Sequence, residues 1–140
     1  MSNSSETPKS KNVLIEIVKS LKGVDIDKEC NIVANTGYDW ADANAAAESL
    51  EEAKKSVLAR LTTKAIEEGS KITKTGAKSI SAIEAEKRAL ADPEYQTHLT
   101  QMVEARKEAN RKRVRYDVAR VRLEMQRSII SLLKQEMNQI

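Results

Sequence analysis

The sequence predicts an all-α protein: an elongated helical hairpin or bundle with one long C-terminal helix that associates with further copies of itself. Three observations lead to this prediction. Every segment with regular apolar spacing repeats at the helical period, and none alternates with a period of two. Charged residues make up 32% of the 140 residues and aromatic residues only 3%, with no Phe. From residue 94 to the C-terminus there is no Gly and no Pro that would stop a helix.

The N-terminal quarter of the chain is expected to contain little stable structure. Residues 1–11 are polar and rich in Ser, and we expect a disordered tail that is not a signal peptide. Residues 12–37 are expected to form a short amphipathic helix that ends near Gly23, followed by a linker with one helical turn around residues 27–33. The short helix is too small to be stable without docking on another surface.

A helical domain is expected over residues 38–140, with a helix at 38–68, a basic loop at 69–78 and a helix at 79–91 capped by Ser79. The first helix carries acidic residues in its N-terminal half and basic residues near its end, which suits the helix dipole. Glycines at 69 and 76 mark the loop. Asp92 and Pro93 are a good N-cap and first residue for a long helix over 93–138, and they separate it from the preceding helix or kink it.

Two apolar rows run along this long helix. One steps by seven from Tyr95 to Met137. The residues of the second row are separated by steps of four and three, which is the spacing of a packed helical seam. Because one chain has too few helices to cover both rows, we expect a homo-oligomer whose interface is the second row: Val114, Val118, Val121, Met125, Ile129 and Leu132.

Cations dominate the middle of the same helix. Between residues 106 and 122 there are eight cations and only two acids. This imbalance favours binding of a polyanion over a merely solvated face, although pairing with the acidic residues of 39–52 is the alternative. The cations are Arg106, Lys107, Arg111, Lys112, Arg113, Arg115, Arg120 and Arg122.

The residues that catalysis or metal binding requires are sparse. Cys30 is the single cysteine and His98 the single histidine, so there is no disulfide framework and no Cys/His ligand cluster. We therefore expect a protein that is not an enzyme and that uses no cofactor and no metal, in the cytoplasm. No apolar run is long enough to span a membrane.

Segments of the C-terminal half resemble small helical phage proteins encoded with recombination genes. They are Asp92-Pro-Glu-Tyr95, Glu104-Ala-Arg-Lys-Glu-Ala109, Arg113-Val-Arg-Tyr-Asp117 and Glu124-Met-Gln-Arg127. The plan of an early helix, a basic loop and a long charged helix over residues 40–137 is similar to the UvsY-type recombination mediators.

That resemblance implies a protein that binds single-stranded DNA, forms ring-like oligomers and helps a RecA-like recombinase displace a single-strand-binding protein in the host cell cytoplasm. It implies phosphate contacts from the cations of the long helix and a secondary set at Lys71, Lys74 and Lys78. With few aromatic residues for base stacking, binding would be mainly electrostatic.

Two other classes of function are open from the residues. The chain could be a non-catalytic helical interaction protein, such as a phage-encoded inhibitor or an assembly chaperone, that binds an acidic protein partner. A membrane-surface helix is disfavoured because the long helix lacks a broad bulky apolar face with Trp or Phe.

Overall fold

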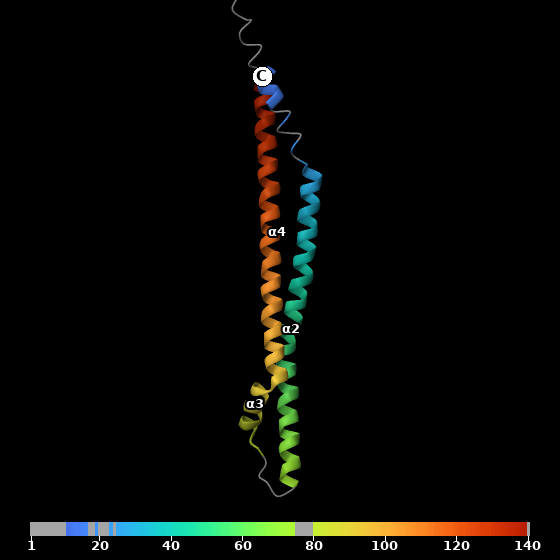
Figure 1. Cartoon of the computed structure of the whole chain (residues 1–140), viewed down its shortest axis with the longest axis vertical. Helices are drawn as coiled ribbons and strands as arrows, with labels where there is room; N and C mark the ends of the chain where they lie inside the picture. The colour runs from blue at the N-terminus through green and yellow to red at the C-terminus, as the bar shows by residue number, and fades with distance from the viewer. Residues whose placement is uncertain (1–10, 17–18, 20–22, 24, 75–79, 140) are drawn as a thin grey trace, which may run out of the picture. The chain divides into compact units, whose positions relative to one another are not determined.

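The computed structural model of the chain describes residues 11–16, 19, 23, 25–74 and 80–139. Its main elements are α2 (Ile26–Lys74), α3 (Ala82–Ala91) and α4 (Pro93–Gln139), and residues 11–16 are also helical (Figure 1). These described residues include no strand, and the three labelled helices alone hold more than two-thirds of the chain. The prediction of an all-α fold with a long C-terminal helix is confirmed.

The chain forms two compact units. The terminal unit consists of Met1–Tyr38 and Arg113–Ile140, and the central unit consists of Asp39–Lys112. In the central unit the segments of α2 and α4 are antiparallel, because Glu94 contacts Arg60 whereas Arg106 contacts Glu51. The terminal unit also contains an antiparallel pair, in which α4 runs from the neighbourhood of Gly37 to that of Glu29.

The helix α2 begins at Ile26, so the predicted linker before residue 38 is wrong. The side chain of Asp25 starts the helix, since its Oδ1 accepts a hydrogen bond from the Lys28 N–H at 3.0 Å. Farther along, Thr36 lies within the helix although threonine has a low helix propensity. Its hydroxyl donates a hydrogen bond to the carbonyl of Ile32, one turn earlier, at 2.7 Å.

Gly37 and Gly69 both lie inside α2, although Gly69 was predicted to begin a loop. A Cβ atom added at Gly37 would lie 3.1 Å from Cε2 of Tyr116, and one added at Gly69 would lie 2.8 Å from Cγ1 of Ile80. A side chain at either position would crowd its neighbour, so these glycines permit close packing rather than end a helix. The predicted loop is therefore wrong over residues 69–74, which are helical, and residues 75–79 lie outside the described part.

The remaining helix ends are set by local capping. Ser81, and not the predicted Ser79, caps α3: its Oγ accepts from the Glu84 N–H at 3.2 Å. Asp92 caps α4 by accepting from the Glu94 N–H at 2.8 Å, and Pro93 follows as predicted. Asp92 thus separates α3 from α4, and α4 ends one residue beyond the predicted position.

The central unit has a small hydrophobic core built from all three of its helices. Leu61, Ala89 and Tyr95 are almost fully buried, and Val57, Leu58 and Leu99 pack against them. Ala47, Ala85 and Ala109 have no exposed surface, so the helix backbones approach closely at these positions. This core holds the segment of α4 that ends at Lys112.

Among the described residues, the terminal unit buries fewer apolar side chains than the central unit. Ala119 and Leu123 of α4 are buried, and Tyr116 is partly buried beside Gly37. Tyr95, Ala109, Tyr116 and Leu123 all belong to the first apolar row of the sequence. These members of the row therefore face the interior of the units, whereas Met137 at the end of the row is exposed.

Candidate nucleic-acid interface

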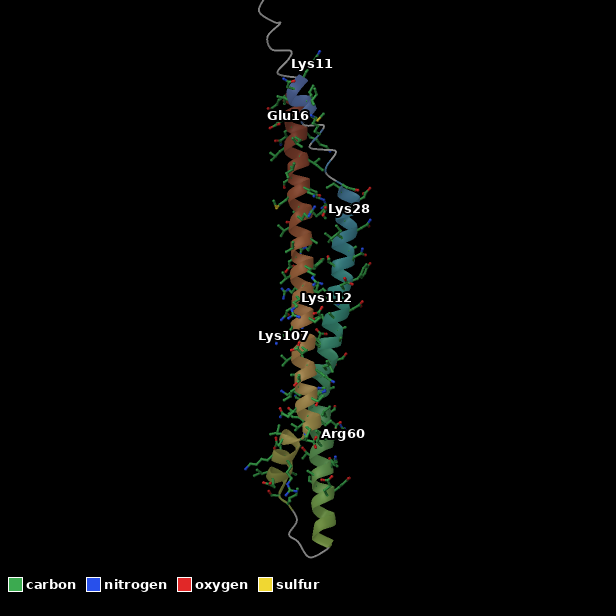
Figure 2. The ribbon with its side chains drawn as sticks, in the orientation of Figure 1. Lys11, Glu16, Lys28, Arg60, Lys107 and Lys112 are labelled. Carbon is green, nitrogen blue, oxygen red and sulfur yellow. The ribbon has the colours of Figure 1, made fainter. Side chains whose placement is uncertain are left out.

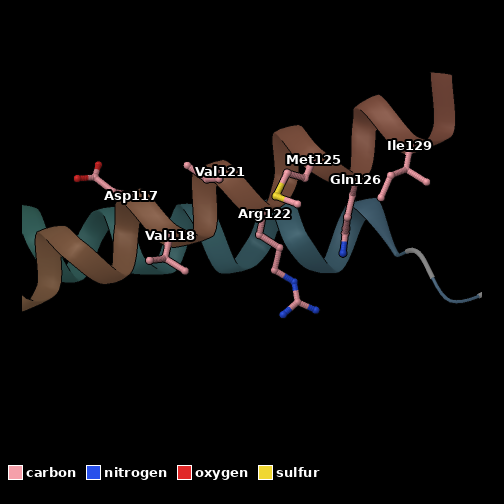
Figure 3. Close-up of a pocket in the computed structure, with 7 residues that line it drawn as sticks. All are labelled: Asp117, Val118, Val121, Arg122, Met125, Gln126 and Ile129. Atoms are coloured by element: carbon pink, nitrogen blue, oxygen red, sulfur yellow. The ribbon is translucent and has the colours of Figure 1, made fainter. Parts of the chain in front are cut away.

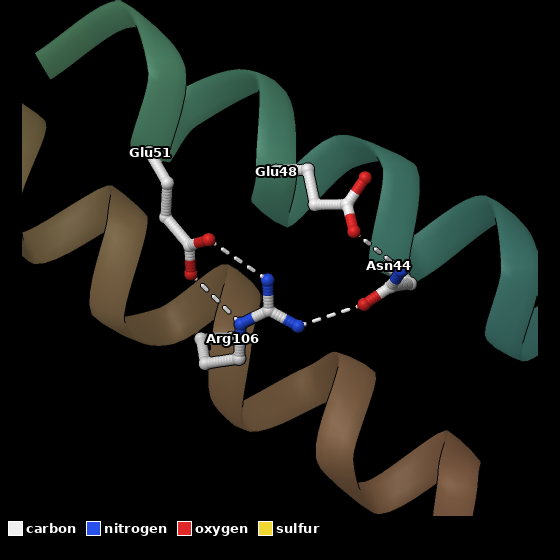
Figure 4. A network of polar contacts seen from close by, with 4 residues as sticks. All are labelled: Asn44, Glu48, Glu51 and Arg106. Carbon is white, nitrogen blue, oxygen red and sulfur yellow. Dashed lines mark hydrogen bonds and ion pairs between the residues drawn. The ribbon is translucent and has the colours of Figure 1, made fainter.

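Arg106 is held within the central unit by three hydrogen bonds. Its Nε and Nη2 donate to the two carboxylate oxygens of Glu51 at 2.8 and 2.9 Å, and Nη1 donates to Asn44 Oδ1 at 2.8 Å (Figure 4). The Asn44 amide is oriented in turn by donating to Glu48 at 3.0 Å. This hydrogen bonding lowers the pKa of Glu51 and raises the pKa of Arg106. Arg106 therefore pairs with an acidic residue of 39–52, which was the alternative interpretation of the sequence to phosphate binding.

The other predicted cations of the central unit are held loosely. Lys107 Nζ lies 3.4 Å from Glu104, and an Arg111 nitrogen lies 3.6 Å from Glu108, with more than half of each basic side chain exposed. Exposed pairs of this kind contribute little to stability, so a phosphate could replace the carboxylate at small cost. Lys112 forms no ion pair with the described residues, and Figure 2 shows Lys107 and Lys112 on α4.

Three predicted cations of the terminal unit are exposed on α4. Arg113 is 64% exposed, with Nε 4.0 Å from Asp117. The Arg120 guanidinium lies 5.6 Å from the centre of the Tyr116 ring, a cation–π distance that leaves its N–H groups free for other acceptors. Arg115 is exposed and forms no ion pair within the described part of the chain.

Arg122 differs from these three because it contacts a buried carboxylate. Glu29 is only 4% exposed, and its Oε1 lies 3.1 Å from Arg122 Nε and accepts from Gln126 Nε2 at 3.4 Å. Glu29 Oε2 and Gln126 Oε1 are buried and have no hydrogen-bond partner among the described residues. Sequence reasoning missed both residues, because Glu29 was assigned to a linker. Arg122 thus pairs with Glu29 through Nε, while 65% of its side chain remains exposed.

The predicted interface row is uncovered in the terminal unit. Its six residues, Val114, Val118, Val121, Met125, Ile129 and Leu132, are between 44% and 62% exposed. Four of them line an open apolar groove of about 520 Å³, together with Asp117, Arg122 and Gln126 (Figure 3). Soluble monomers rarely expose a continuous apolar strip of this kind.

The secondary basic set is only partly described. Lys71 and Lys74 lie in the last turns of α2 and not in a loop, whereas Lys78 lies outside the described residues. The set therefore supplies no geometry for a phosphate site.

The residues considered for catalysis have structural contacts. The His98 Nε2 atom lies 2.8 Å from the Leu50 carbonyl oxygen, and Cys30 Sγ lies 4.0 Å from an Arg127 nitrogen. Within the described ranges, no group of His, Cys, Asp and Glu could hold a metal ion. None of the helices searched there is long and apolar enough to cross a membrane.

Comparisons with protein-family models, with curated proteins and with solved structures found no match to this chain.

Proposed function

We propose that this chain is a self-associating helical protein that binds single-stranded DNA non-specifically through exposed cations of α4. The observation that carries the proposal is the presence of two features on one unit: the exposed guanidinium groups of Arg113 and Arg120, and the uncovered apolar row. By its resemblance to UvsY-type mediators, the complex would assist loading of a RecA-like recombinase.

The proposed contacts are ionic and independent of base sequence. Arg113 and Arg120 are seven residues apart on α4, so they lie on the same side of the helix about 10 Å apart. A flexible single strand can adjust its phosphates to such a spacing. With Trp40 and three tyrosines as its aromatic residues, the chain has little surface for base stacking, so most of the affinity would come from counterion release.

Self-association would turn weak contacts into useful affinity. Two or three arginines per chain bind a phosphate backbone weakly, whereas an assembly presents several such sets to one strand and raises the effective concentration of each. Burying the apolar row between copies supplies the driving force for that assembly.

A salt titration tests the DNA-binding proposal. We expect the logarithm of the association constant for a single-stranded oligonucleotide to fall with the logarithm of salt concentration, with a slope of about −0.7 per phosphate contact. The double variant Arg113→Ala/Arg120→Ala should reduce that slope and leave the assembly state unchanged.

The matched control is Lys55→Ala/Lys64→Ala, which removes the same charge from exposed positions of α2. An equal reduction of the slope in both variants would mean that only net charge matters and would contradict a binding site on α4. Displacement of a single-strand-binding protein by a RecA-like recombinase, measured with and without the chain, tests the mediator step separately.

The second candidate function is binding of an acidic protein partner. Arg106 with Glu51 and Arg122 with Glu29 favour it, since both show arginines of α4 already pairing with carboxylates of a neighbouring helix. Competition between poly-L-glutamate and an oligonucleotide distinguishes the two candidates. Retention of the polypeptide without retention of DNA at low salt would replace the first proposal by the second.

A further inference from the structure

We propose that copies of this chain associate along the Val114–Leu132 row with their α4 helices parallel and in register. The inference rests on the proposed self-association and adds to it the direction of packing. The occupant of the apolar groove is then the same groove of a second copy.

The row has the spacing of a coiled-coil seam. Val118, Met125 and Leu132 are seven residues apart and take the a positions, and Val114 and Val121 take the d positions. Ser128 continues the d positions, and its small side chain does not prevent close packing. Ile129, the sixth residue of the row, takes the e position next to Ser128. All five apolar side chains are more than half exposed, so the seam is available to a partner.

The two edges of the seam carry opposite charges. Asp117 and Glu124 take the g positions along one edge, and Arg115 and Arg122 take the e positions along the other. All four side chains are exposed. In Figure 3 the side chains of Asp117 and Arg122 point away from each other on either side of α4.

This charge arrangement selects one direction of packing. In a parallel pair the g edge of one helix meets the e edge of the other, so that Asp117 lies next to Arg122 of the second copy. In an antiparallel pair like edges meet, so that carboxylates face carboxylates and guanidinium groups face guanidinium groups. Like charges opposed across a seam weaken association, so the antiparallel arrangement is disfavoured.

Parallel packing also bears on the proposed DNA contacts. Arg113 and Arg120 take c positions, outside the seam, and remain exposed when the row is covered. In register, the equivalent arginines of all copies lie at the same height along the assembly. Their positive potentials would therefore add around one bound strand.

Disulfide cross-linking tests the direction. In a Cys30→Ala background, Val114→Cys and Leu132→Cys each place one thiol at an end of the row. In a parallel assembly each variant alone should form a disulfide with its own copies under oxidised glutathione. In an antiparallel assembly neither variant should cross-link alone, and an equimolar mixture should give the disulfide between positions 114 and 132.

Self-cross-linking of each single variant supports the inference. A product that forms only in the mixture overturns it, and so does the absence of all products while light scattering still shows an oligomer. A monomeric wild-type chain at micromolar concentration would instead refute the proposed self-association itself.

A charge reversal provides a second test without cysteines. Asp117→Arg should raise the dissociation constant of a parallel assembly roughly tenfold at low salt, because an attraction to Arg122 of the next copy becomes a repulsion. In an antiparallel assembly the same change relieves repulsion and tightens association, which would contradict the inference. Glu52→Arg, the same change of charge on an exposed position of α2, is the matched control and should have little effect.

Discussion

The central and terminal units are both built on antiparallel segments of α2 and α4, yet they differ in what covers their apolar side chains. In the central unit α3 packs onto the pair, and Leu61, Ala89 and Tyr95 form a closed core. In the terminal unit the described contacts across the pair involve Gly37, Glu29 and Gln126, and the row from Val114 to Leu132 stays exposed.

This difference separates two roles along one helix. The segment of α4 in the central unit contributes Tyr95 and Ala109 to the buried interior, whereas the segment in the terminal unit leaves the row from Val114 to Leu132 exposed, and we propose that this row serves association. Changes in the central unit should therefore act on folding stability, and changes on the exposed row should act on assembly.

The largest expected effect is on the central core. Leu61→Ala should lower the free energy of unfolding by about 2–5 kcal/mol, because Leu61 is only 2% exposed and its truncation leaves a cavity. Urea unfolding followed by circular dichroism measures this change, at a protein concentration low enough for the chain to be monomeric. Leu132→Ala is the matched control, and a comparable loss there would contradict the proposed division of roles.

The second effect is on assembly. Ile129→Asp/Leu132→Asp should weaken association on the order of a hundredfold, because one carboxylate would have to be buried in the seam and a second at its edge. Sedimentation velocity over a concentration series measures the shift to smaller species. The control Ile66→Asp/Ile83→Asp changes two exposed residues of the central unit, and an equal shift there would place the interface elsewhere.

The smallest effect concerns the ion pair of the central unit. The hydrogen bond from Arg106 holds the pKa of Glu51 below its ordinary value, so the charged form stabilises the fold. That stabilisation is fully present above the ordinary pKa of Glu, about 4.3, and is lost as the pH falls through the lowered folded-state value.

Glu51→Gln should therefore shift the urea midpoint modestly at pH 7, and the difference from wild type should shrink as the pH is lowered toward 3. Glu52→Gln serves as the control, because Glu52 is exposed and lies beside Glu51 in sequence. A difference that grows at acid pH would contradict the assigned role of the pair.

Local signals and periodicity account for what the sequence predicted correctly. Asp92 and Pro93 mark the start of α4 because capping depends on neighbouring residues, and the step of seven from Tyr95 identifies the buried face. The early start of α2 was missed because the packing of Gly37 against Tyr116, which is remote in sequence, cannot be predicted from local signals.

The contacts of the individual arginines likewise depend on residues that are remote in sequence. The sequence left both phosphate binding and pairing with acids open for Arg106. Only the register of α4 against α2 places Glu51 and Asn44 beside it. Charge counting alone cannot separate such an arginine from the exposed Arg113.

The buried carboxylate of Glu29 has a consequence for how accurately the two helix segments of the terminal unit are aligned. A seam of small and aliphatic side chains tolerates sliding, since a shift of one turn replaces one apolar contact by another. Sliding by one turn would carry Glu29 away from Arg122 and Gln126 and leave a charge in an apolar seam, which is strongly unfavourable. Glu29 thus destabilises misaligned pairings of the α2 and α4 segments more than it stabilises the correct pairing.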